Sequence, residues 1–181
     1  LSTHTGGFTG YTYRDLTNDI PSIADHWKSL DLKFDAVATG YLGSFEQIKI
    51  VSDFFDKFKT DDNLIIVDPV MGDKGHFYAG FTEDFALEMK KLCSKADVIV
   101  PNLTEAGQLL DEDYIDGGYN EEYIKNLLIR LSNLGSKIVV LTGVSFDDNS
   151  QGVMSYNRET GEFSSYFNEN IPGYFHSTGD I

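Results

Sequence analysis

The feature that most constrains the fold is a set of short, almost uninterrupted apolar runs separated by helical patterns. These runs of four or five residues occupy positions 36–40, 64–67, 97–100 and 137–141. Nearly continuous apolar composition is typical of strands in a parallel sheet, because helices cover such a sheet on both faces. The sequence therefore predicts an α/β fold with three layers and a doubly wound, mainly parallel sheet.

The segments between these runs have the apolar spacing of amphipathic helices. We expect helices over 44–59, 81–94 and 120–134. Ser44 and Gln47 occupy the positions of a capping box at the start of the first helix. Two alternating segments, 151–156 and 162–167, flank a turn at 157–161 and predict a hairpin, and 8–16 is a candidate strand outside the main layer.

Composition narrows the class of protein further. A length of 181 residues with 41% hydrophobic content suits one domain over 1–181. A net charge of −15 argues against nucleic acid as a partner, because such binding depends on basic side chains. A small phosphorylated ligand remains compatible, since backbone donors and Mg²⁺ can hold it.

The sequence also indicates a compartment. It has no apolar run long enough for a membrane span and no signal-peptide pattern. Its single cysteine, Cys93, excludes an internal disulfide and favours a reducing, cytoplasmic environment. Because the neighbours of Cys93 are apolar and helical in pattern, we expect this side chain to have a packing role.

Polar and glycine-containing sequences follow each predicted strand. They are GY at 40–41, DPVMGD at 68–73, PNLTE at 101–105 and TG at 142–143. In an open α/β sheet, ligands bind beyond the carboxyl ends of the strands. Four strand ends with this chemistry therefore predict a ligand site at one edge of the sheet.

Each of these residues also has a structural interpretation. Asn102 and Glu105 suit a helix N-cap and its reciprocal partner, which is compatible with a ligand site because a capped helix start also faces the crevice. Asp73 suits a surface turn, Tyr41 an aromatic at the edge of the core, and His4 a polar packing residue. No His or Cys group has the spacing of a structural zinc site.

The sequence STGD at 177–180 has the composition of an anion-binding turn. A glycine-containing turn that leads into a helix directs backbone N–H groups and the helix dipole at one anion. The Asp180 carboxylate can take a proton from an incoming hydroxyl, so this turn is compatible with phosphoryl transfer. The alternative is an ordinary turn with an Asp cap.

The ordered set of motifs resembles the ribokinase-like superfamily, and within it the bacterial pyridoxal and pyridoxamine kinases of the vitamin B6 kinase branch. DPVMGD at 68–73, PN at 101–102 with Glu105, and TGD at 178–180 carry this resemblance. STHTG at 2–6 and TGY at 39–41 are similar to the substrate-side segments of that branch. The match covers nearly the whole chain in the right order.

The resemblance implies transfer of the ATP γ-phosphate to the 5′-hydroxymethyl group of a B6 vitamer. It implies that Asp180 is the catalytic base, with Ser177, Thr178 and Gly179 as the anion hole. It places Thr5, His4 and Tyr41 at the pyridine substrate. It assigns the ATP side of the site to residues that follow the strands: Asp68, Asp73, Asn102, Glu105, Thr142 and Gly143. Of these, it implies that Asp68, Asp73 and Glu105 hold Mg²⁺, partly through water.

The resemblance also implies a homodimer and an incomplete domain. The family's opening strand would precede Leu1 and its anion-hole helix would follow Ile181, so we expect this polypeptide alone to have little or no kinase activity. Ser177 departs from the usual glycine, and a side chain there restricts the turn. Two alternatives stay open: a hydroxymethylpyrimidine or sugar kinase of the same fold, and a non-catalytic nucleotide- or ligand-binding protein.

Overall fold

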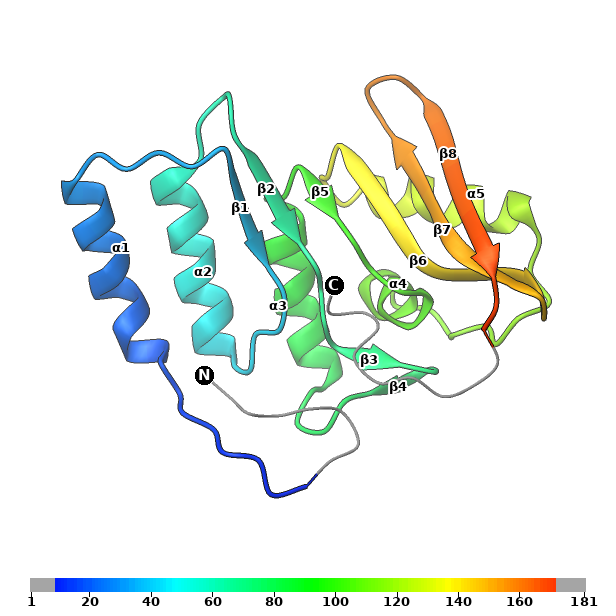
Figure 1. Ribbon diagram of the computed structural model, residues 1–181, viewed down its shortest axis with the longest axis horizontal. Helices are drawn as coiled ribbons and strands as arrows, with labels where there is room; N and C mark the ends of the chain where they lie inside the picture. Colours follow the sequence, from blue (N-terminus) through cyan, green and yellow to red (C-terminus); the bar gives the residue numbers. More distant parts are fainter. Residues whose placement is uncertain (1–8, 172–181) are drawn as a thin grey trace.

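A computed structural model describes residues 9–171 as a six-stranded sheet with helices packed against it (Figure 1). The strands lie in the order β1-β2-β5-β6-β7-β8. The first four are parallel, and β6, β7 and β8 form an antiparallel meander. The predicted α/β class with a mainly parallel sheet is confirmed. The strand bounds are β1 Ala36–Thr39, β2 Leu64–Val67, β5 Val98–Ile99, β6 Ile138–Asp147, β7 Ser150–Asn157 and β8 Glu162–Glu169.

All three predicted helices are present, and each is slightly shorter than its sequence pattern. They are α2 (Phe45–Phe58), α3 (Glu83–Cys93) and α5 (Glu121–Ser132). Two further helices, α1 (Ile20–Ser29) and α4 (Leu103–Leu110), were not predicted as elements, and a short 3₁₀ turn, η1 (Thr17–Asp19), precedes α1. Within 9–171, no helix is long and apolar enough to cross a membrane.

The helix caps follow their sequence signals closely. At the start of α2 the Ser44 hydroxyl accepts the N–H of Gln47, as the capping box requires. The Gln47 side chain accepts the N–H of Gly43 at 2.7 Å, one residue earlier than the motif predicts.

Cys93 is fully buried at the end of α3, which confirms its packing role, and burial raises the pKa of its thiol.

The five helices form one layer because the strand order never reverses. Right-handed crossovers that progress in one direction along a sheet place each helix on the same face. Successive helices from α1 to α5 accordingly contact one another. Their shared face buries alternate sheet residues, namely Ile65, Val67, Ile99, Val139 and Leu141. The second helical layer of a doubly wound sheet does not occur within 9–171.

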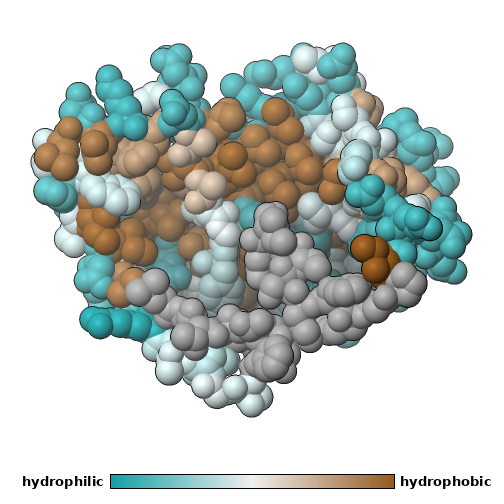
Figure 2. Space-filling model, in the orientation of Figure 1, coloured by the Kyte–Doolittle hydropathy of each residue, from teal (hydrophilic) through white to brown (hydrophobic). Residues whose placement is uncertain are grey.

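The opposite face of the sheet is also apolar. Side chains alternate along a strand, so the neighbours of the buried residues point away from the helices. Figure 2 shows this apolar surface in the orientation of Figure 1. Its members on the central strands are partly exposed, Leu64 to 47%: Leu64, Ile66, Val98, Val100, Ile138 and Val140.

Two expectations about strands were wrong. Residues 9–16 form no strand, apart from a single bridge residue at Tyr13. β6 does not end at Leu141 but continues to Asp147, so Thr142 and Gly143 lie inside it. The register with β7 shifts between Thr142 and Val144, and Gly143 has a φ of +72°. A bulge at this glycine therefore lets β6 bend and keep pairing with the predicted hairpin, β7–β8, which is confirmed.

Candidate nucleotide site

A pocket of about 350 Å³ opens beyond the carboxyl end of β5 and beside the bulge of β6. Four residues that the resemblance assigned to the nucleotide side line it together: Asp73, Asn102, Thr142 and Gly143. They come from different elements and are far apart in the chain. The remaining lining residues are Lys74, Leu103, Thr104, Tyr114, Asp116 and Gln151, which the motifs did not single out as site residues.

Asn102 fixes the start of α4 beside β6. Its side-chain oxygen accepts the N–H of Glu105, and the Glu105 carboxylate accepts the N–H of Asn102, each at 2.9 Å. This capping box confirms the structural interpretation of the pair. Asn102 also forms a parallel bridge with Thr142, whose N–H donates to Pro101 at 2.9 Å. The cap and the pocket are therefore built by the same residues.

Glu105 lies behind the pocket and is only 3% exposed. A second oxygen accepts the N–H of Met71 at 3.1 Å. Burial raises the pKa of Glu105 to about 7 despite these donors, and the nearby charge of Asp68 contributes to the rise. Asp68 and Glu105 are therefore neighbours, although neither lines the pocket itself.

No group of three His, Cys, Asp or Glu side chains gathers as a metal site in the part of the chain that the structure describes. Asp73 lines the pocket, whereas Asp68 and Glu105 do not. Mg²⁺ needs only one or two protein carboxylates when phosphates and water complete its shell. This donor set suits a magnesium ion that arrives with a nucleotide, and the Mg²⁺ ligands stay a prediction.

A small hairpin after β2 carries Asp73 to the pocket rim. It consists of β3 (Gly72–Asp73) and β4 (His76–Phe77), and its turn is Lys74-Gly75, which confirms the turn interpretation of Asp73. Both turn residues have positive φ, +50° and +77°, as in a type I′ turn. The Asn102 side-chain amide donates to the carbonyl of Gly72 at 2.9 Å. The hairpin is thereby tied to the start of α4.

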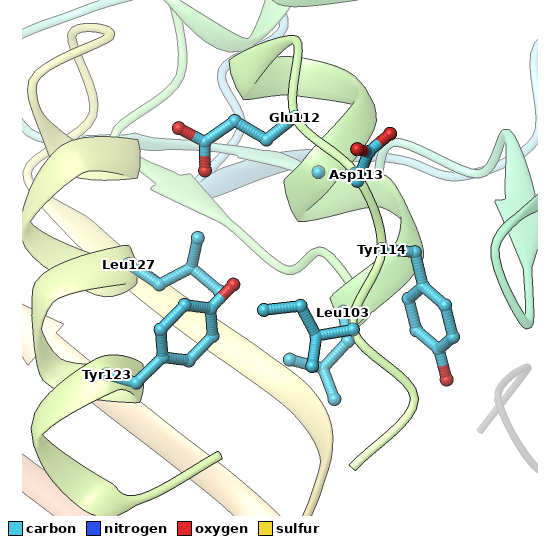
Figure 3. A pocket seen from close by; sticks show the side chains of 8 residues that line it. Leu103, Glu112, Asp113, Tyr114, Tyr123 and Leu127 are labelled. Carbon is cyan, nitrogen blue, oxygen red and sulfur yellow. The ribbon is translucent and has the colours of Figure 1, made fainter. Parts of the chain in front are cut away.

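The segment between α4 and α5 separates the pocket from a smaller cavity. Figure 3 shows this cavity of about 10 Å³, with Tyr123 and Leu127 of α5 facing Leu103 of α4. It has room for about one water molecule and is too small for an organic ligand. Leu103 of α4 and Tyr114 of the segment between α4 and α5 line both spaces, so this segment forms part of the pocket wall.

Tyr41 follows β1 at the same edge of the sheet and is 62% exposed, yet its ring contacts Phe81 of the core, as expected of an aromatic at the edge of the core. Its ring centroid lies 5.6 Å from that of Phe81, which stacks on Phe85 at 4.4 Å. Partial burial raises the pKa of the Tyr41 phenol, with the phenols of Tyr13 and Tyr11 nearby. The remaining predicted site residues lie outside the described residues: His4, Thr5, Ser177, Thr178, Gly179 and Asp180.

The phosphomethylpyrimidine kinase family model matches residues 19–181. The chain therefore belongs to this family, whose members share the ribokinase-like fold.

Three relatives are similar to this chain in sequence, and two of them also in structure. A structure from Bacteroides thetaiotaomicron, assigned as a phosphomethylpyrimidine kinase, is 40% identical, with a TM-score of 0.94 over 99% of this chain and 62% of its own. Another crystal form of that protein was solved with pyridoxal. Pyridoxal kinase from Lactobacillus plantarum is 30% identical, with a TM-score of 0.84 over 98% of this chain and 62% of its own.

The third relative is the thiamine biosynthetic bifunctional enzyme TH1 of Arabidopsis thaliana. It is 31% identical over 140 residues, which cover 74% of this chain and 25% of the plant enzyme. The chain thus spans about three fifths of the length of these solved structures and a quarter of the plant enzyme.

Proposed function

We propose that this chain belongs to an ATP-dependent kinase that phosphorylates the 5′-hydroxymethyl group of pyridoxal, pyridoxamine or pyridoxine. The observation that carries the proposal is the convergence of Asp73, Asn102, Thr142 and Gly143 on one pocket at the carboxyl edge of the sheet. A B6 vitamer as the acceptor is supported by the pyridoxal complex of the Bacteroides relative and by the Lactobacillus pyridoxal kinase.

Phosphoryl transfer depends mainly on positioning and on charge stabilisation. In this proposal Asn102 and Thr142 orient the nucleotide, and the backbone of Gly143 allows its close approach. Asp180 takes the proton from the substrate hydroxyl, and the N–H groups of the turn that precedes it hold the phosphoryl oxygens. Tyr41 contributes an aromatic surface for the pyridine ring.

Mg²⁺ bound with the nucleotide would neutralise part of the phosphate charge. In this proposal Asp73, which lines the pocket, would be one of its ligands, and Asp68 and Glu105 would contribute partly through water. The Glu105 carboxylate also accepts hydrogen bonds from the N–H groups of Met71 and Asn102. It therefore fixes the backbone at Asn102, which lines the pocket, with or without the ion.

The experiment compares wild type with Asp180→Asn in the complete gene product that contains this sequence. We expect kcat for pyridoxamine to fall by roughly 100-fold or more, the scale of losing a positioned base. The KM values should change much less. An unchanged kcat would contradict the base role. For residues 1–181 alone we propose little or no turnover, and family-like turnover in a coupled ATP-consumption assay would contradict that.

A second candidate substrate is a hydroxymethylpyrimidine. The family model and the Arabidopsis thiamine enzyme support this alternative. A panel of B6 vitamers and hydroxymethylpyrimidine, compared by kcat/KM, separates the two. Binding of ATP and pyridoxamine without turnover would instead indicate a non-catalytic binding protein. We further propose a homodimer, which sedimentation of the complete gene product tests.

A further inference from the structure

The turn of the β3–β4 hairpin holds a lysine in an unusual conformation. Lys74 has a φ of +50°, in the left-handed region that side chains other than those of Gly, Asn and Asp seldom adopt. Asparagine, aspartate or glycine is the ordinary residue at this position of a type I′ turn. A strained backbone that the surrounding structure maintains is a reason to look for a function.

The surrounding structure maintains this turn from two sides. The N–H of Gly75 donates to the hydroxyl of Thr104 at 2.9 Å, and Thr104 is only 3% exposed. The ring of Tyr114 packs so closely on Gly75 that an added Cβ would lie 2.9 Å from its Cδ1. Asn102 holds the other end of the hairpin through Gly72. Three pocket-lining residues therefore fix where the turn lies.

The positive charge of Lys74 also differs from the charges of the other pocket-lining side chains. Among the pocket-lining residues within 9–171, Lys74 is the only lysine or arginine, and it shares the rim with two carboxylates, Asp73 and Asp116. A polyphosphate in this pocket would meet two negative side chains and one positive side chain. A lysine in that place supplies a hydrogen bond in which both donor and acceptor are charged, which no other described lining side chain offers.

We propose that Lys74 binds the phosphate chain of the nucleotide, and that Thr104 and Tyr114 are positioning residues that hold the Lys74-Gly75 turn over the pocket. This inference rests on the proposed nucleotide function. It adds a cationic phosphate contact that the strand-end motifs did not include, and it explains why a lysine occupies a position where asparagine or glycine would fit the backbone better.

The test is isothermal titration calorimetry on the complete gene product, with ATP plus Mg²⁺ and with adenosine. Lys74→Asn keeps the left-handed turn and removes the charge. We expect it to weaken ATP binding about tenfold, the scale of a hydrogen bond to a charged group. Adenosine binding should not change, because adenosine carries no phosphate. Lys74→Arg should retain most of the ATP affinity, and Lys33→Asn, at the opposite edge of the sheet, is the matched charge control.

A thermal melt separates this role from a structural one. Lys74→Asn should unfold at the same or a higher temperature than wild type, because asparagine tolerates positive φ. Thr104→Val should speed hydrogen exchange at the Gly75 amide and weaken ATP binding, and Thr104→Ser should restore both. A parallel loss of adenosine and ATP affinity in Lys74→Asn would overturn the phosphate contact.

The outcomes distinguish the two proposals. If the wild-type protein binds neither ATP nor adenosine, the nucleotide function and the Lys74 contact both fail. If wild type binds ATP and Lys74→Asn binds it equally well, only the Lys74 contact fails.

Discussion

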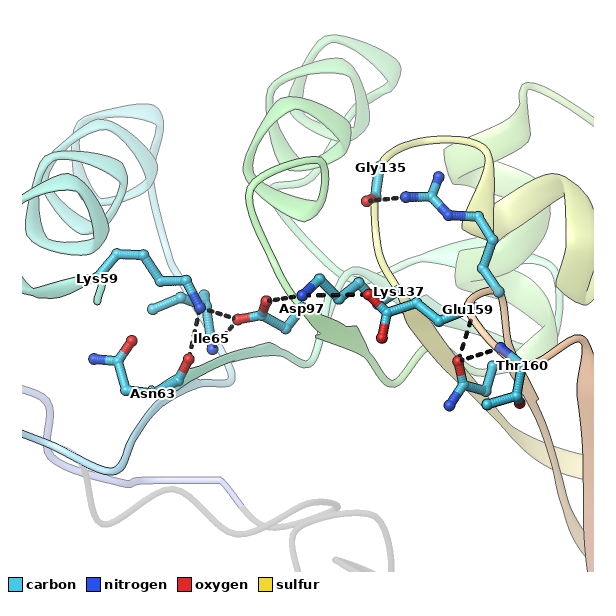
Figure 4. A network of polar contacts seen from close by, with 10 residues as sticks. Lys59, Asn63, Ile65, Asp97, Gly135, Lys137, Glu159 and Thr160 are labelled. Atoms are coloured by element: carbon cyan, nitrogen blue, oxygen red, sulfur yellow. Dashed lines mark hydrogen bonds and ion pairs between the residues drawn. The ribbon is translucent and has the colours of Figure 1, made fainter. Parts of the chain in front are cut away.

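Two buried carboxylates at opposite edges of the sheet have opposite environments. Glu105, behind the pocket, accepts backbone N–H groups and lies near the negative charge of Asp68. Asp97, just before β5 at the amino edge, accepts the Lys59 ammonium at 2.6 Å and the N–H of Ile65 at 2.8 Å. Figure 4 shows the network that Asp97 joins, which continues through Lys137.

The difference appears in the pKa values. Burial would raise the pKa of Asp97, but the hydrogen bonds from Lys59 and Ile65 and the charges of Lys59 and Lys137 outweigh it and lower this pKa. The pKa of Glu105 is raised to about 7, chiefly by burial. Asp97 is thus paired with cations that favour its charged form, whereas Glu105 has only backbone N–H donors and a neighbouring negative charge.

The largest expected effect on the free energy of unfolding is that of a substitution at the amino edge of the sheet. Asp97→Ala removes the acceptor of the Ile65 N–H and the carboxylate partner of the Lys59 ammonium, and should lower the free energy of unfolding by about 3–4 kcal/mol. Asp56→Ala, which removes an exposed ion pair with Lys95, is the control and should cost less than about 1 kcal/mol. Urea unfolding measures both, and equal losses would remove the contrast between the two kinds of pair.

The next largest effect is on the pH dependence of the free energy of unfolding, which should differ between Glu105 at one edge of the sheet and Asp97 at the other. The unfolded Glu105 carboxyl ionises near 4.5, while the folded one keeps its proton until about pH 7. Its folded pKa is raised, so its contribution to stability is largest below pH 4.5 and declines as the pH rises to 7. Between these values wild type should lose about 2–3 kcal/mol relative to Glu105→Gln.

Urea unfolding without nucleotide or Mg²⁺, at several pH values, measures this loss. The contribution of Asp97 has the opposite sign, because its folded pKa is lowered, and it is lost as the pH falls below the usual range of an aspartate. A constant difference between wild type and Glu105→Gln would show that Glu105 is not a strained buried charge.

Two asparagine caps allow a matched comparison. Asn102→Ala removes the cap of α4 and the hydrogen bond to Gly72, at a cost of about 1–2 kcal/mol. Asn120→Ala removes the corresponding cap of α5, which accepts the N–H of Tyr123, at about 1 kcal/mol. Only the first should also weaken ATP binding, because Asn120 does not line the pocket. Equal ATP affinities in calorimetry would argue against a nucleotide role for Asn102.

The smallest expected effect on the free energy of unfolding is that of replacing Lys137. Its ammonium lies 3.9 Å from Asp97 and its side chain is 52% exposed, so Lys137→Met should change the free energy of unfolding by less than about 0.5 kcal/mol. Lys59→Met should cost about 1–2 kcal/mol, because Lys59 also donates to the carbonyl of Asn63. Thermal or urea unfolding of both variants ranks them, and the reverse order would mean that the longer contact is the stronger one.

The sequence by itself determined the elements whose signals are local. The apolar runs located the parallel strands, and apolar spacing with a polar cap located α2, α3 and α5. It indicated the start of α4 through Asn102 and Glu105 but gave no extent for this helix, in which Gly107 lowers the helix propensity. The structure explains that glycine, since a Cβ on it would lie 2.9 Å from the carbonyl oxygen of Glu112.

Only the tertiary structure decided how the pocket is closed. The strand-end motifs supplied Asp73, Asn102 and Thr142, because parallel strands end at one edge. Tyr114 and Asp116 come from a segment without periodicity, so no local pattern places them beside these residues. Nor could composition show that the strand order never reverses and leaves every helix of 9–171 on one face. Periodicity and capping act within a few residues, whereas sheet order and pocket walls depend on contacts between distant parts of the chain.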